Sequence, residues 1–296
     1  MLSDLYAKLY WTLLACFCVL GLCLAFTQPL FSLPDEPAHW QTAHVRAERL
    51  LNSAPCVRSV RQGNCPKRGP CSTIPPLELS CTEALPIYGG VLTYPGVLLS
   101  KLMLPRQTES GTRQVQAIML ARLLAGLLVV ACLVRAGVLV AGAQRQGLLV
   151  LGAFLLSPLV AQQSFAVSSD GVQIAFGVCL FCAVVAWDRL GWIDLALFLF
   201  FGFCSTSKPT LLPCVLPAVL AGHWFAQVAG KEHPSARDAI RALVRDLKWS
   251  RSPSVQTLTL WSAIGLSLLT VYASLHHDAV ASASEVPSVA RQVNTE

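Results

Sequence analysis

Seven apolar stretches, each about as long as a helix that crosses a bilayer, constrain the fold of this chain more than any other feature. Hydrophobic residues make up 54% of the sequence and charged residues only 13%. A membrane span needs roughly 20 apolar residues in a helix, because backbone polar groups cannot stay unpaired in lipid. The pattern predicts an all-α polytopic membrane protein and excludes a soluble domain. The expected spans are 9–27, 115–141, 147–166, 171–187, 191–206, 208–226 and 256–275.

An eighth apolar stretch, 85–104, is also long enough to cross, but its composition argues against a continuous helix. Pro86 and Pro95 each remove a backbone donor, and three glycines add conformational freedom. We therefore expect this stretch to be an interfacial or re-entrant segment.

The distribution of Lys and Arg predicts the topology, because these residues mark short cytoplasmic loops. The segment 227–255 is strongly basic and the turn after the second span contains Arg145, so both should be cytoplasmic, together with the N-terminus. The first span should remain as an anchor, since no small-x-small cleavage pattern follows it. The predicted organisation is a first transmembrane helix at 1–27, an extracytoplasmic loop at 28–114, a transmembrane bundle at 115–226, the cytoplasmic segment at 227–255, a last transmembrane helix at 256–275 and an extracytoplasmic polar tail at 276–296.

The basic segment also has a helical pattern. Ser235 and Asp238 have the spacing of a capping box, and an apolar stripe runs beside the basic residues. This pattern predicts a short amphipathic helix on anionic lipid, and we expect no nucleic-acid partner for the formal charge of +6. The stripe consists of Ile240, Leu243, Val244 and Leu247.

Cysteines divide by predicted compartment. Four lie in the large first loop, where an oxidising environment favours two disulfides with three possible pairings. Their spacing lacks the close CxxC pairs of structural zinc sites. Cys179 and Cys182 form a CxxC inside an apolar helix, where we expect packing rather than redox chemistry. The disulfide candidates are Cys56, Cys65, Cys71 and Cys81.

The loop begins with an acidic motif, Pro34-Asp35-Glu36-Pro37-Ala38-His39. Asp35 suits the N-cap of a helix, which would place Glu36 and His39 on one face. One carboxylate could take a proton from an acceptor hydroxyl while the other positions that hydroxyl or holds Mg²⁺ or Mn²⁺. His39 could complete the metal site or hold the acceptor. The alternative is a structural helix start, in which the acidic residues offset the helix dipole. The two interpretations are compatible, because a cap can also fix a catalytic carboxylate.

The run Leu33–Trp40 resembles the signature of a group of bacterial multi-span membrane proteins catalogued as a domain of unknown function. That group is similar to GT-C glycosyltransferases, which take a sugar from a polyprenyl-phosphate carrier and have an acidic pair in the first outer loop. The resemblance implies a GT-C-like helical bundle with Asp35 and Glu36 as catalytic residues. It continues in Leu85–Tyr88, Tyr94–Pro95, Ala121–Leu123, Ser168–Asp170 and Ser207–Pro209.

Three further residues are candidates for substrate binding alongside His39. Lys208, followed by Pro209, would sit at a helix N-terminus that attracts phosphate, or it could be a snorkelling boundary lysine. Arg122 lies in an apolar run and should face the interior, where it could pair with Asp170 or phosphate, unless it lies at interface depth. Asp170 could instead cap the next helix.

The resemblance, taken with these residues, implies a glycosyltransferase in the bacterial plasma (inner) membrane that transfers a sugar from polyprenyl phosphate to a cell-envelope glycan or protein. The sequence contains no Gly-rich phosphate loop, nucleophile elbow or HExxH motif, which disfavours soluble nucleotide-driven chemistry. The alternative is a transporter of lipid-linked sugars or a non-catalytic assembly subunit, because Pro-interrupted spans also suit a transport path.

Overall fold

The computed structural model describes residues 2–28, 39–40, 43, 95–103, 111–205, 210–228, 236–247 and 253–284. Every regular element in these ranges is a helix, which confirms the predicted all-α class for this part of the chain. The longer helices are α1 (Leu2–Thr27), α4 (Gly111–Ala143), α7 (Ser169–Val185), α8 (Trp192–Ser205), α9 (Val215–Val228), α10 (Ala236–Leu247) and α11 (Val255–Ser284). The shorter ones are α3 (Pro95–Met103), α5 (Gly147–Leu155), α6 (Pro158–Ser164), η2 (Trp187–Arg189) and η3 (Leu212–Cys214).

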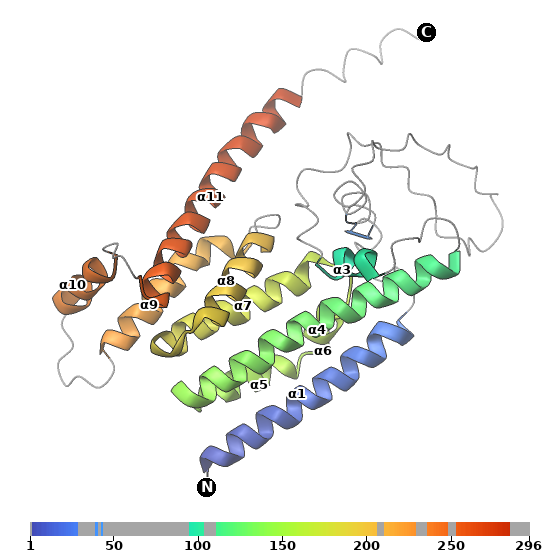
Figure 1. Cartoon of the computed structure of the whole chain (residues 1–296), viewed down its shortest axis with the longest axis horizontal. Helices are drawn as coiled ribbons and strands as arrows, with labels where there is room; N and C mark the ends of the chain where they lie inside the picture. The colour runs from blue at the N-terminus through green and yellow to red at the C-terminus, as the bar shows by residue number, and fades with distance from the viewer. Residues whose placement is uncertain are drawn as a thin grey trace, which may run out of the picture.

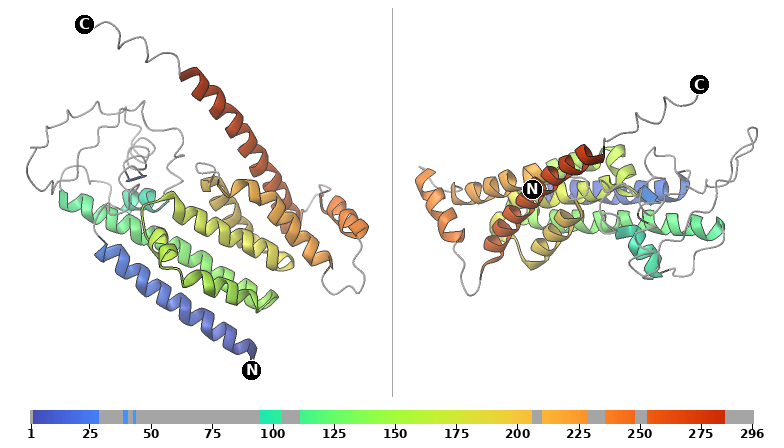
Figure 2. Two further views of the ribbon diagram at one scale, coloured as in Figure 1. Left: turned by 180° about the vertical axis from the view of Figure 1, so that it is seen from behind. Right: turned by 90° about the horizontal axis from the view of Figure 1, so that it is seen from above.

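The long helices lie side by side and alternate in direction along the chain (Figures 1 and 2). We call the end where α1 finishes and α4 and α7 begin the distal end. The opposite end, where α1 begins and α4 finishes, is the proximal end. The short α3 lies at the distal end, and α10 lies at the proximal end beside α9.

Three of these helices are long and apolar enough to cross a bilayer: Asp4–Thr27, Val115–Ala143 and Val255–Tyr272. Large apolar side chains on their outer faces remain exposed, as in Val19 at 62% and Leu268 at 65%. An apolar surface of this kind is suited to contact with lipid. The helices therefore support the membrane class that the composition predicts.

The predicted span 147–166 is not one continuous helix. It consists of α5 and α6, which meet at an angle of 76° and together count as a fourth candidate span. Pro158 occupies the first turn of α6, and Ser157 before it has an extended backbone. Proline has no backbone N–H to donate and disfavours helical geometry in the residue before it, which explains the break.

The core is built around α7, which packs against α4, α8 and α9. Phe165, after α6, is 2% exposed and fits between α1 and α4. Its ring fills the space beside Gly21 and Gly126, where a Cβ on either glycine would collide with it. Tyr10 also joins these two helices by donating to the carbonyl oxygen of Leu133 at 2.6 Å. Small residues and one aromatic ring thus fix the α1–α4 crossing.

Candidate functional site

The structure describes only part of the predicted site. Asp35, Glu36 and Lys208 lie outside the described residues, as do the disulfide candidates Cys56, Cys65, Cys71 and Cys81. His39, Arg122 and Asp170 are described, and the contacts of Trp40 and Arg122 and the start of α7 place all three toward the distal end of the bundle.

His39 is 5% exposed, and His39, Trp40 and Ala43 each have helical backbone geometry. Trp40 and Ala43 form a small apolar cluster with residues of α3, α4 and the turn before α7. The chain that follows the acidic motif is therefore held against the bundle. The other members of the cluster are Val97, Ala117, Ile118, Ala121 and Val167.

Arg122 is 1% exposed and lies on α4, three turns from its start. Its Nη1 donates to the carbonyl oxygen of Gln28 at 2.9 Å, just beyond the end of α1. A guanidinium in an apolar helix is expected to find polar partners inside the protein. This contact fixes the start of the chain segment that leads to Asp35.

Lys101 is a second buried cation at the distal end, and its burial was not predicted from the sequence. It lies on α3 and is 3% exposed. The signal was a lysine within the apolar stretch 85–104, four residues after Val97, which the core also buries. Because α3 has only nine residues, it is short for a crossing, and it packs along α4 at the distal end.

Asp170 does not cap α7, contrary to one expectation. The cap is Ser168, whose Oγ accepts a hydrogen bond from the Asp170 backbone N–H at 3.3 Å. Asp170 lies one position inside the helix, where a carboxylate offsets the helix dipole. Serine serves as the N-cap because its hydroxyl accepts this bond while its backbone stays extended.

Four buried polar atoms on α6, α7 and α8 have no hydrogen-bond partner within the described part of the chain. They lie at the distal ends of α6, α7 and α8, on elements that pack together. Unpaired buried polar atoms are rare in folded proteins, and a bound water, ion or ligand is one way to satisfy them. The atoms are Ser164 Oγ, Ser169 Oγ, Gln173 Nε2 and Ser205 Oγ.

Gln173 also stands at one end of an apolar groove of about 430 Å³. The groove runs between α5 and α7, and its walls include Phe154, Gly177 and Phe181. Thr210 lies at the same end and donates to Gln173 Oε1 at 3.1 Å. The volume is in the range of small-molecule sites, and the lining suits a hydrocarbon chain.

Lys208 comes two residues before Thr210 in the sequence. The helix that Lys208 was expected to begin starts later in the chain. The regular part of α9 starts at Val215, after the 3₁₀ turn Leu212–Cys214. Pro213 falls within this turn, and its missing N–H disfavours an earlier start of the α-helix. The expected span 208–226 therefore has its regular α-helix only from Val215 onward, and Pro209 itself lies outside the described residues.

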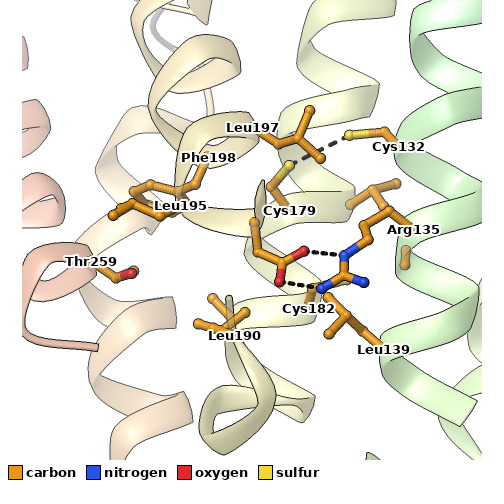
Figure 3. A pocket seen from close by; sticks show the side chains of 14 residues that line it. Cys132, Arg135, Leu139, Cys179, Cys182, Leu190, Leu195, Leu197, Phe198 and Thr259 are labelled. Atoms are coloured by element: carbon orange, nitrogen blue, oxygen red, sulfur yellow. Dashed lines mark hydrogen bonds and ion pairs between the residues drawn. The ribbon is translucent and has the colours of Figure 1, made fainter. Parts of the chain in front are cut away.

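An ion pair at the proximal end was not predicted from the sequence (Figure 3). Arg135 of α4 contacts Asp194 of α8 through two parallel bonds, Nε–Oδ1 at 2.7 Å and Nη2–Oδ2 at 2.8 Å. The backbone N–H of Gly191 donates to Oδ2 as well, at 2.8 Å. The Asp194 side chain is 7% exposed. An arginine and an aspartate inside apolar helices were the available signal.

Cys132, Cys179 and Cys182 lie beside this pair (Figure 3). All three are free thiols, and the Sγ atoms of Cys132 and Cys179 are 3.6 Å apart. Cys179 and Cys182 pack in the core of the bundle, and no disulfide joins them. Within the described ranges, no three His, Cys, Asp or Glu side chains are placed to hold a metal ion.

A comparison of the chain with protein-family models, curated proteins and solved structures finds no match.

Proposed function

We propose that the protein is a GT-C-like membrane glycosyltransferase that moves a sugar from a polyprenyl-phosphate donor to a glycan or protein of the cell envelope. The observation that carries the proposal is the pair of buried cations at the distal end. Arg122 and Lys101 are 1% and 3% exposed, and buried His39 comes from the same end. Cations at such depth suit a phosphate, which offers several acceptor oxygens.

The acidic pair would perform the chemistry. Arg122 holds Gln28, which begins the segment that leads to Asp35. Only two residues lie between Glu36 and His39, so their Cα atoms are about 11 Å apart at most. One carboxylate takes the proton of the acceptor hydroxyl while the hydroxyl oxygen forms a bond to the anomeric carbon of the sugar. The bond from that carbon to the phosphate oxygen breaks, and the polyprenyl phosphate keeps the electron pair. Mg²⁺ or Mn²⁺ held by the other carboxylate of the pair, with His39, would neutralise phosphate charge.

The groove beside α7 supports a donor with an apolar tail. Its volume of about 430 Å³ and its apolar walls suit an isoprenoid segment. Its polar end contains Gln173 and Thr210, and Thr210 follows Lys208 by two residues. A tail in this groove would bring the donor phosphate toward the proposed substrate-binding residues.

The proposed topology has seven crossings, with the N-terminus in the cytoplasm and the distal end outside. The helices α7, α8 and Leu212–Val228 are apolar but have fewer than 18 residues, so they would cross where the bundle thins the bilayer. The alternation of helix directions supports this arrangement (Figure 1). In a bacterial plasma membrane, lipid-linked sugars and envelope acceptors would then reach the distal end.

A transporter of lipid-linked sugars is the second candidate. The 76° break between α5 and α6 favours it, because broken helices line the substrate paths of many transporters. Donor flux across vesicles without sugar release would identify a transporter, whereas release without flux would identify the enzyme.

Donor turnover in membranes that contain the full chain tests the enzyme. We expect the combined variant Asp35→Asn and Glu36→Gln to lose at least about 100-fold of sugar release from a labelled polyprenyl-phosphate sugar, since general acid–base groups contribute that much or more. The matched control, Asp4→Asn with Asp188→Asn, removes two exposed carboxylates from the proximal end and should retain release. Unchanged release in the first variant would refute the catalytic assignment.

A further inference from the structure

The amphipathic helix α10 has two chemically different faces, and their division differs from the predicted stripe. Ala242 is 5% exposed, and Leu243 and Leu247 pack against the core of the bundle. Ile240 and Val244 point the other way, at 57% and 53% exposed. Only half of the predicted apolar stripe therefore stabilises the fold, and the other half is left on the outside.

Three arginines share the outer face with these two apolar residues. Arg237, Arg241 and Arg245 are spaced four residues apart and are all exposed. At 100° of helical turn per residue, they and the two apolar side chains fall within an arc of about 140°. Arg245 approaches Asp246 at 3.7 Å, yet its side chain stays 73% exposed. The face combines positive charge with apolar side chains.

A buried contact fixes α10 to α9. His223, 2% exposed, lies 3.0 Å from Asp246 through its Nε2 atom. Trp187 stacks edge-on against the same imidazole at a centroid distance of 5.9 Å. The inner face of α10 is thus attached to the bundle, and the orientation of its outer face follows from this attachment.

The same contact sets the depth of α10 relative to the bilayer. Trp224, the residue after His223, is 39% exposed, and Trp192 at the proximal start of α8 is 64% exposed. Exposed tryptophans on membrane helices gather at the level of the lipid headgroups. Because Asp246 meets α9 beside Trp224, α10 lies at this level, at the lateral edge of the bundle (Figures 1 and 2).

We propose that the outer face of α10 binds the anionic phospholipid headgroups of the adjacent leaflet. The arginines contact the phosphates, and Ile240 and Val244 insert at the boundary with the acyl chains. The charge of the face is complementary to this occupant, and its depth matches. The proposal does not depend on the glycosyltransferase assignment, because it concerns the opposite end of the bundle.

Hydrogen exchange in lipid nanodiscs tests the proposal with the full chain. We expect backbone exchange in 236–247 to be at least threefold slower in nanodiscs with phosphatidylglycerol than in nanodiscs of phosphatidylcholine alone. The triple variant Arg237→Gln, Arg241→Gln and Arg245→Gln should lose this difference, while the corresponding lysine variant keeps most of it. Glutamine and lysine preserve helix propensity, so the helix itself should remain.

A charge-matched control separates the face from net charge. Lys8→Gln, Arg145→Gln and Arg189→Gln remove three exposed cations elsewhere at the proximal end and should leave the threefold slowing unchanged. An equal loss in this control, or equal exchange in both lipids, would overturn the proposal. Slowing that requires two protein copies per nanodisc instead of anionic lipid would also overturn it, because the occupant would then be a second copy.

Discussion

At the scale of single residues, the ion pair between Arg135 and Asp194 is a two-bond polar contact between two of the described helices. Its two parallel bonds, at 2.7 and 2.8 Å, have the geometry in which arginine and carboxylate bind best. The backbone N–H of Gly191 gives the carboxylate a third donor. The pair joins α4 to the start of α8, which are separated in sequence by the whole of α5, α6 and α7.

Removing one partner should therefore lower the free energy of unfolding by more than an isolated surface ion pair contributes to it. We expect Asp194→Asn to lower the free energy of unfolding by about 2 to 3 kcal/mol, because it leaves a partly buried guanidinium without its counter-ion. Denaturant unfolding in detergent micelles measures the change. The control Asp188→Asn alters an exposed carboxylate six residues earlier and should change stability by less than about 0.5 kcal/mol. Equal effects in both variants would show that the pair contributes no specific stability.

At the scale of helices, close packing depends on glycines whose positions fix how near two helices approach. Gly222 of α9 faces α7, and a Cβ there would collide with the carbonyl oxygen of Ala183, a backbone atom that cannot easily move. Gly265 of α11 is the opposite case, with nothing within 4 Å of its added Cβ. Both glycines lie inside apolar helices, so their sequence contexts look alike.

The two sites should respond to alanine with opposite sign. We expect Gly222→Ala to destabilise the protein by about 1 to 3 kcal/mol through overpacking. Gly265→Ala should stabilise it by as much as about 1 kcal/mol, since alanine has the higher helix propensity. Thermal unfolding of both variants in the same detergent compares them directly. A Gly222→Ala variant as stable as the unsubstituted protein would mean that α7 and α9 are less closely packed than in the structure.

The elements that could be predicted from the sequence are those that depend on local properties of the chain. Features that depend on contacts between distant segments could not be predicted. Hydropathy placed α1, α4 and α11 correctly, because a long apolar helix is a local property of the chain. The break at Pro158 and the late start of α9 depend on backbone donors that hydropathy ignores. The burial of Lys101 and the pairing of Arg135 with Asp194 depend on contacts between distant segments, which periodicity cannot reveal.

At the scale of the whole molecule, the alternation of helix directions bears on the position of every loop. The end of α1 and the starts of α4 and α7 share the distal end, whereas the turn at 144–146 and α10 lie at the proximal end (Figure 1). If the distal end is outside, the acidic pair, Arg122 and the polar end of the groove share one compartment. An extra crossing between α1 and α4 would instead require these two helices to run in the same direction, which the observed alternation contradicts.

Alkaline-phosphatase fusions test this arrangement, because the enzyme is active only outside the cytoplasm. Fusions after residues 110 and 169 should be active, and fusions after 146 and 235 should be inactive. The 146 fusion is the internal control for the 169 fusion, since only the broken pair α5 and α6 separates them. Equal activity at 146 and 169 would mean that this pair is re-entrant instead of a crossing. Activity at 110 and 235 without activity at 169 would separate the two halves of the proposed site and refute it.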